Sequence, residues 1–126
     1  MTSPGEVESR HTLRTAVARY EELRAREVID GLAADEVLEL LALSEVIARK
    51  AGYGRQLSVR NARAAGASWT AIGRALGTTK QAAWEAHTRW IDTQSAQHRS
   101  SGHEGFDDAE AAAVRRLAGA PDDVVP

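Results

Sequence analysis

The sequence predicts an all-α protein with a trihelical helix-turn-helix core, two amphipathic helices before it, a short helix after it and no β-wing. Apolar residues recur every three or four positions through most of the chain, which is the spacing of one helix face. No segment shows the strict alternation of a half-buried strand. Glycines at positions 66 and 77 mark breaks between predicted helices. We expect three regions, at 1–53, 54–92 and 93–126.

Residues 1–53 are predicted to form a helical packing and dimerisation region. Residues 1–8 are expected to be mobile. Over 9–29, apolar residues recur at helical spacing and charged residues occupy the opposite face, which predicts one amphipathic helix. A second helix is expected over 34–50, and it is apolar on more than one face. A second copy of the chain is the simplest partner for the apolar surface that the first helix does not cover. The alternative is a monomer that buries both faces. The expected dimerisation residues are Val37, Leu40, Leu41 and Ile47.

Three helices are predicted in the middle of the chain, at 57–65, 69–76 and 79 to about 94. Ser68 precedes the second of them and offers a hydroxyl N-cap. Trp69 opens that helix and is expected to pack into the trihelical core. Small and apolar side chains are expected where the last two helices meet, at Ile72, Gly73, Ala75, Leu76, Ala83 and Ala86.

The turn between the last two helices has a recognisable chemistry. Gly77 tolerates the positive φ with which many helices end. Thr78 then offers a hydroxyl N-cap, and Gln81 stands three residues later, as a capping box requires. Two short helices joined in this way are typical of a helix-turn-helix that enters the major groove of DNA.

The run I-G-x-x-L-G-T-T-K-Q-A-A, from Ile72 to Ala83, resembles the helix-turn-helix of sigma factor region 4. It is more similar still to small actinobacterial regulators often labelled AsnC-like, with Thr78 at a position where Val is commoner. The start of that pattern is matched by Ala65, Gly66, Ser68 and Trp69. The resemblance is limited to about residues 65–90, and it implies DNA binding without indicating an operator or an effector.

Positive charge is concentrated on the same segment. The chain has a net charge of −2, which by itself argues against nucleic acid. Residues 54–91, however, carry six basic side chains and only one acidic side chain, Glu85. The segments on either side are net negative. Because phosphate binding requires a cationic patch, the distribution of charge along the chain favours DNA binding, although the net charge does not.

Base contacts are expected from the exposed start of the third core helix. The candidates are Thr79, Lys80, Gln81, Trp84, Glu85 and Thr88. Gln81 can pair with N6 and N7 of adenine, unless its side chain is occupied as a helix cap. Lys80 can donate to guanine or to a phosphate, and Glu85 can accept from cytosine. Trp84 is equally compatible with the core, a DNA-backbone contact or a thymine methyl.

Phosphate contacts are expected from hydroxyl and guanidinium groups around that helix, with structural ion pairs as the alternative for the arginines. The candidates are Ser68, Thr70, Thr78, Arg55, Arg60, Arg63, Arg74 and Arg89.

The C-terminal region, 93–126, is predicted to begin with a polar linker over 93–105. A short alanine-rich helix is expected over 107–118, followed by a mobile tail over 119–126. His98, His103 and Glu104 lie in the linker, but they lack a second ligand pair at helical spacing, so we expect no metal site.

Composition narrows the class of protein further. A hydrophobic content of 43% and a charged content of 27% are typical of a folded soluble domain. The chain has no cysteine, no run of about 20 apolar residues and no secretory signal, which predicts a cytoplasmic protein without membrane contact. No nucleophile–base–acid set and no phosphate-cradling glycine loop is present, so we expect neither an enzyme nor a cofactor.

These observations predict a sequence-specific double-stranded DNA-binding protein, acting as a homodimeric transcriptional regulator. Two alternatives stay open. One is a protein-interaction module, antitoxin-like or binding RNA polymerase or a sigma factor, in which the leucine-rich helices meet a protein partner. The other is a phage or plasmid DNA-handling subunit, which would form rings or filaments instead of closed dimers.

Overall fold

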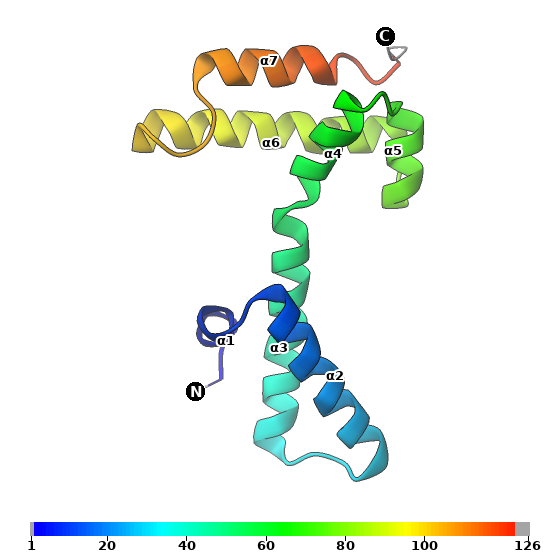
Figure 1. Ribbon diagram of the computed structural model, residues 1–126, viewed down its shortest axis with the longest axis vertical. Coiled ribbons are helices and arrows are strands. Elements are labelled where there is room, and N and C mark those ends of the chain that lie inside the picture. Colours follow the sequence, from blue (N-terminus) through cyan, green and yellow to red (C-terminus); the bar gives the residue numbers. More distant parts are fainter. Residues whose placement is uncertain (1, 123–126) are drawn as a thin grey trace. The chain divides into compact units, whose positions relative to one another are not determined.

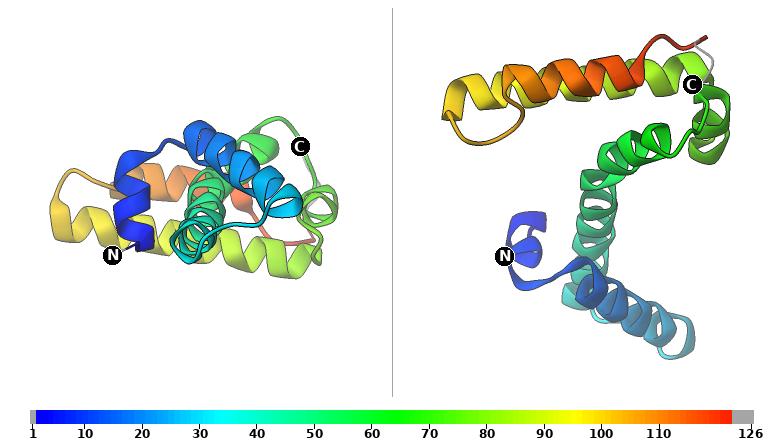
Figure 2. Two further views of the ribbon diagram at one scale, coloured as in Figure 1. Left: turned by 90° about the horizontal axis from the view of Figure 1, so that it is seen from below. Right: turned by 45° about the horizontal axis from the view of Figure 1, so that its top comes forward.

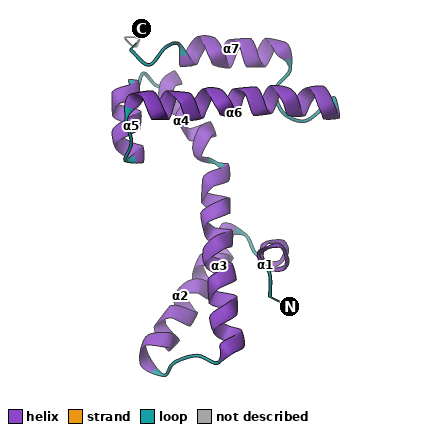
Figure 3. Cartoon of the chain, turned by 180° about the vertical axis from the view of Figure 1, so that it is seen from behind, coloured by secondary structure: helices purple, strands orange, loops and turns teal. Residues whose placement is uncertain are grey.

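The computed structural model describes residues 2–122, and within that range the chain forms seven helices and no strand (Figure 3). The all-α prediction is therefore confirmed for the described part of the chain. The chain divides into two compact units, Met1–Gly54 and Arg55–Pro126. We call them unit 1 and unit 2, and each is described by itself.

Unit 1 contains α1 (Pro4–Arg10), α2 (Leu13–Ile29) and α3 (Ala34–Tyr53) (Figure 1). The prediction of a mobile start and one helix over 9–29 is wrong, because two helices occupy this stretch. Ser3 caps α1 by accepting from the N–H of Glu6, and a proline in the first turn has the fixed φ that a helix start favours. The Thr12 side chain caps α2 in the same way, which separates the two helices.

The core of unit 1 is aliphatic and lies between α3 and the two helices before it. It consists of Val7, Ala16, Leu23, Leu40, Ala42, Leu43 and Val46. Leu40 is thus buried, and its predicted place in a dimer interface is wrong. Ile47 packs against this core and Val37 is half-buried, whereas Leu41 is 60% exposed. Of the four predicted dimerisation residues, Leu41 alone is strongly exposed.

Ion pairs connect the helices of unit 1. Arg19 makes two hydrogen bonds of 2.9 Å to the carboxylate of Glu39, and Arg26 pairs with Glu36 at 2.6 Å. Both pairs join α2 to α3. The Arg19 guanidinium hydrogen-bonds to Glu39 and holds the pKa of that carboxyl below its usual value. These arginines are therefore neutralised within the unit.

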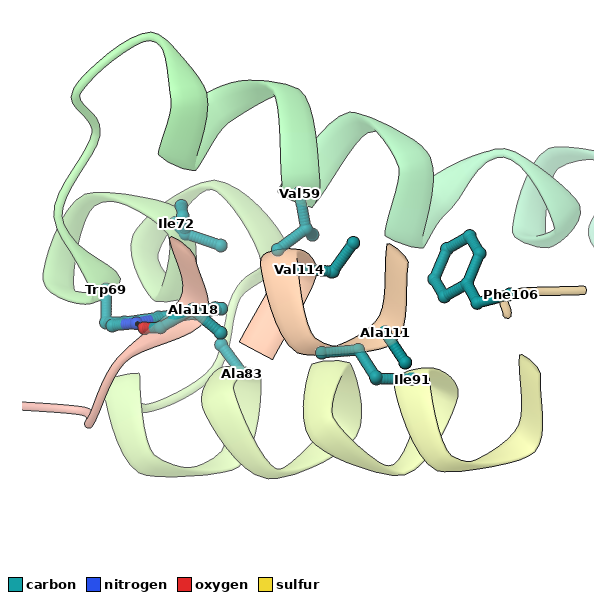
Figure 4. Packing of buried hydrophobic residues seen from close by; sticks show 9 residues of the cluster. All are labelled: Val59, Trp69, Ile72, Ala83, Ile91, Phe106, Ala111, Val114 and Ala118. Carbon is teal, nitrogen blue, oxygen red and sulfur yellow. Dashed lines mark hydrogen bonds between the residues drawn. The ribbon is translucent and has the colours of Figure 1, made fainter. Parts of the chain in front are cut away.

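Unit 2 contains α4 (Arg55–Ala64), α5 (Trp69–Leu76), α6 (Lys80–Ser101) and α7 (Asp108–Ala118). The α7 helix runs back along α6 and packs against it (Figure 1), and in the right-hand view of Figure 2 it lies in front of α6. All four helices contribute to one core, which Figure 4 shows from close by. The core residues are Val59, Trp69, Ile72, Ala83, Ile91, Phe106, Ala111, Val114 and Ala118.

The predicted linker over 93–105 is mostly helix, because α6 continues to Ser101. The buried face of α6 in this stretch is polar, and Ser95 on it is 5% exposed. The sequence there therefore lacks the large apolar residues that would have predicted a helix packed against α7. Gly102 ends α6 with a φ of 81°, and the chain returns through Gly105. A Cβ at position 105 would lie 2.1 Å from the Gln94 carbonyl oxygen, so only glycine fits this close turn.

The tail predicted to be mobile, 119–126, is described as far as Asp122. Within this part the Gly119 carbonyl is held by a side chain of α6 and the Asp122 carboxylate pairs with Lys80. Residues 123–126 lie outside the described range.

Candidate nucleic-acid interface

Three residues set the ends of the helices on either side of the α5–α6 connection: two hydroxyl caps and one glycine. Ser68 caps α5 by accepting from the N–H of Ala71 at 3.1 Å. Gly77 ends α5 in the left-handed region, with a φ of 72°. Thr79 caps α6 by accepting from the N–H of Ala82 at 3.0 Å. The predicted cap at Thr78 is therefore wrong by one residue, and Gln81 is not part of a capping box.

Gly73 is the residue that lets the two helices approach. A Cβ at this position would lie 2.9 Å from the Thr78 carbonyl oxygen and 3.0 Å from the Lys80 nitrogen. These are backbone atoms of the turn, which cannot move aside as a flexible side chain does. The other predicted small contact, Ala75, is exposed, and Leu76 is 37% exposed, so the prediction of inner-face contacts is wrong for both. Ile72 and Ala83 do lie in the core.

The outward face of α6 carries a stripe of polar side chains. Gln81, Glu85 and Arg89 are exposed and stand one helical turn apart. Gln81 Nε2 donates to Glu85 Oε1 at 2.9 Å, which orders the amide at the start of the stripe. Thr88 is half-buried, and its hydroxyl donates to the carbonyl of Glu85 within the helix. We call Gln81, Glu85 and Arg89 the α6 stripe.

Trp84 does not belong to that stripe. Its indole N–H donates to the Gly119 carbonyl oxygen at 2.7 Å, and its ring packs against the core of unit 2. Of the three alternatives left open for Trp84, the structure supports a place beside the core, and the indole N–H already donates to the segment after α7 instead of being free for the DNA backbone.

Arg63 also departs from its expected role. It is 5% exposed, and its guanidinium donates to the carbonyls of Leu117 and Ala67 at 3.2 and 3.1 Å. The same guanidinium lies 5.3 Å from the centre of the Trp69 ring. A phosphate cannot reach a side chain that is buried and bonded in this way, so the prediction of a phosphate contact at Arg63 is wrong.

Three exposed arginines of unit 2 lack carboxylate partners in the described part of the chain, whereas Lys80 pairs with Asp122 and Arg115 with Asp92. Among residues 2–122, no carboxylate pairs with Arg55, Arg74 or Arg89, and all three side chains are exposed. Arg60 is half-buried over the Phe106 ring, 5.6 Å from its centre. Glutamates of unit 1, in contrast, neutralise Arg19, Arg24, Arg26 and Arg49. Of the predicted hydroxyl contacts, Thr70 and Thr78 are exposed and Ser68 is half-buried as a cap.

His87 is a central residue of unit 2 that the sequence analysis did not single out. It is 1% exposed and lies between two tryptophans, with ring centres 5.6 Å from Trp69 and 5.3 Å from Trp90. Its Nδ1 is 2.8 Å from Gln56 Oε1. Burial, and the nearby charges of Arg63 and Arg60, lower the pKa of His87 to about 4, so the ring is neutral near pH 7. His87 lies four residues from both Ala83 and Ile91, and this spacing would have predicted that it shares their buried face of the helix.

Three side chains from the first three helices of unit 2 hold the carboxyl end of α7. Arg63, Trp69 and Trp84 donate to the carbonyls of residues 117, 118 and 119 respectively. The last carbonyls of a helix have no partner within the helix and favour nearby donors. The α7 helix is therefore fixed against α4, α5 and α6 by hydrogen bonds as well as by its apolar face.

No protein-family model, curated protein or solved structure gives a match to this chain. Within residues 2–122, no helix has the length and apolar character needed to cross a lipid bilayer.

Proposed function

We propose that unit 2 binds double-stranded DNA in a sequence-specific manner and that the protein regulates transcription. The observation that carries the proposal is that unit 2 combines two features: the exposed, ordered α6 stripe and exposed arginines that lack carboxylate partners. Unpaired cations on a folded surface are available to phosphates without first breaking an ion pair. We propose α4, α5 and α6 as the trihelical helix-turn-helix, with α6 entering the major groove. Binding, not catalysis, is the proposed activity.

The start of α6 has the chemistry for reading a base. Gln81 can accept from adenine N6 through its side-chain oxygen and donate to N7 through Nε2. Because Nε2 carries two hydrogens, one can remain on Glu85 while the other contacts the base. Glu85 then fixes the orientation of the amide before DNA arrives. An amide that is already ordered loses less conformational entropy on binding.

The cations would set affinity and salt dependence. Arg89 lies on the stripe itself, Lys80 at the head of α6, and Arg55 and Arg74 on the two preceding helices. Each phosphate contact releases a condensed counterion, so affinity should fall steeply with salt. Thr70, Thr78 and Thr79 would add hydroxyl contacts to the backbone.

We also propose that the protein acts as a homodimer through the outer side of α3. Leu38 is 55% exposed and Leu41 is 60% exposed on this helix, three residues apart and on the side away from the unit 1 core. A symmetric pair of chains would present two copies of α6 to a palindromic site, about 34–36 Å apart.

Selection of bound duplexes from a random pool tests the proposal. We expect one enriched motif for the wild-type chain, arranged as an inverted repeat. The Gln81→Ala variant should lose discrimination at one position of each half-site, by about 1–3 kcal/mol, while keeping the rest of the motif. Glu21→Ala, an exposed change in unit 1, is the control and should leave the motif unchanged. A pool that stays random for the wild type would reject sequence-specific DNA binding.

A protein-interaction module is the second candidate, because the same exposed leucines can meet a different protein. Beside them, a groove of about 390 Å³ lies between α2 and α3, lined mainly by apolar atoms of Val17, Tyr20 and Ile47. In this case Gln81→Ala would leave function intact, whereas Leu41→Glu would abolish it. Gln81→Ala therefore separates the candidates, whereas Leu41→Glu would impair function in both, through the homodimer or through the protein partner.

A further inference from the structure

We infer that the segment after α7 attenuates DNA binding, because the Asp122 carboxylate holds Lys80, and that duplex phosphates displace it. This inference rests on the proposed function, since it concerns the head of the same helix. It adds a contact within the chain that competes with the ligand.

The chain leaving α7 is fixed beside α6. The indole of Trp69 donates to the Ala118 carbonyl at 2.8 Å, and the indole of Trp84 donates to the Gly119 carbonyl at 2.7 Å. Three residues further on, the Asp122 carboxylate forms an ion pair with Lys80 Nζ. The position of the acidic group therefore follows from two anchored carbonyls just before it.

The direction of the segment places it along one flank of α6. Lys80 and Trp84 are four residues apart, so they lie on the same side of the helix, one turn apart. Gly119 is held at Trp84 and Asp122 at Lys80, which means that the segment runs toward the amino end of α6. The α6 stripe begins at Gln81, the residue next to Lys80. The segment therefore borders the surface that a duplex would use.

The carboxylate of Asp122 offers Lys80 what a phosphate offers. Both groups are anions with oxygen acceptors, and both are favoured near the positive end of a helix dipole. While the ion pair is formed, one cation at the head of α6 is neutralised. DNA binding must then replace one anion with another at Lys80, and it gains less there than at an unpaired arginine.

The exposure of the pair decides how strong the effect is. The Lys80 side chain is 47% exposed and that of Asp122 is 81% exposed. Exposed ion pairs are weak and are screened by salt, so a polyanion can open this one. We expect attenuation of about three- to fivefold at low salt, which corresponds to the upper part of the range for exposed pairs. The segment thus acts as a modest competitor and not as an off-switch.

The experiment measures the affinity of the full chain for a labelled mixed-sequence duplex by fluorescence anisotropy, at about 50 mM salt. Asp122→Asn removes the charge with little change of shape, and we expect it to lower Kd about three- to fivefold. Asp30→Asn is the matched control, because Asp30 is exposed at the end of α2 and no cation pairs with it among the described residues. It changes the net charge equally and should alter Kd by less than about twofold.

A second pair of variants identifies Lys80 as the target. If Asp122 acts by holding Lys80, then Asp122→Asn should have no effect when Lys80→Gln is already present. The inference is overturned if Asp122→Asn binds no more tightly than Asp30→Asn, or if its gain persists in the Lys80→Gln background. Absence of DNA binding by the wild type and by every variant would instead reject the proposed function, and this inference with it.

Discussion

The indole N–H of Trp69 donates to the carbonyl oxygen of Ala118 at 2.8 Å, across 49 residues of sequence. This bond joins the first residue of α5 to the last residue of α7. It is buried, so neither partner can turn to water when the other is lost. The C-terminal helix is therefore part of the same folded unit as the proposed DNA-binding helices.

Trp69→Phe should destabilise unit 2 by about 1–3 kcal/mol, because it leaves the Ala118 carbonyl buried without a donor. Urea unfolding followed by circular dichroism measures this. Trp90→Phe is the control, since the Trp90 indole donates to no acceptor among the described residues and its ring is half-buried. A loss no larger for Trp69→Phe than for Trp90→Phe would show that the hydrogen bond contributes little.

Gly73→Ala should destabilise the protein by about 1–3 kcal/mol, because the added Cβ would meet backbone atoms of the α5–α6 turn. Gly52→Ala is the matched variant. It lies in α3 with open space around its Cβ, and it should be neutral or stabilise by up to about 1 kcal/mol. Thermal unfolding of both compares them directly. Equal effects of the two substitutions would contradict the close approach described at Gly73.

Stability should fall as the pH is lowered from about 7 to about 5, because His87 is held neutral in the folded state. Its pKa is lowered from 6.5 to about 4, so the unfolded chain binds a proton between these values and the folded chain does not. The stabilisation is present above about pH 6.5 and is lost as the pH falls toward 4, by about 2 kcal/mol at pH 5. Urea unfolding at both pH values measures it. His87→Gln should show a smaller change, and an unchanged pH dependence would assign the effect to other groups.

Leu40→Ala and Leu41→Ala should separate core packing from association in unit 1. Leu40 is 7% exposed, and its truncation should cost about 2–5 kcal/mol of folding free energy. Leu41 is 60% exposed, and its truncation should leave the fold intact while weakening dimerisation. Analytical ultracentrifugation of each variant gives its mass. A wild-type chain that stays monomeric at every concentration would contradict the proposed homodimer.

Local sequence patterns were most informative where a cap or a glycine fixes the backbone. The bounds expected for the α5 helix, 69–76, agree with the structure, because Ser68 and Gly77 define its two ends. Thr78 and Thr79 are chemically equal as caps, so the sequence alone could not choose between them. The break between α1 and α2 was not predicted, because the helical spacing of apolar residues continues across Thr12. The Thr12 side chain nevertheless caps α2 and so starts a new helix there.

Tertiary packing decided what local patterns could not. The far half of α6 is polar in composition, and α7 packs against α6. Arg63 and Trp84 carry the polar groups of typical DNA contacts, yet both donate to carbonyls at the end of α7. A sequence reading cannot foresee that a helix more than 20 residues later uses these donors. The exposed α6 stripe, in contrast, follows from the period of four between Gln81, Glu85 and Arg89.

The most direct test of DNA binding by unit 2 is the salt dependence of duplex affinity. With about four or five phosphate contacts for each chain, log Kd should change with log salt with a slope of about four. Arg89→Gln should reduce that slope by about one, whereas Arg24→Gln, whose arginine is paired with Glu27 in unit 1, should leave it unchanged. No measurable binding at low salt, or equal losses for the two variants, would contradict the assignment of α6 and its neighbours as the DNA-binding surface.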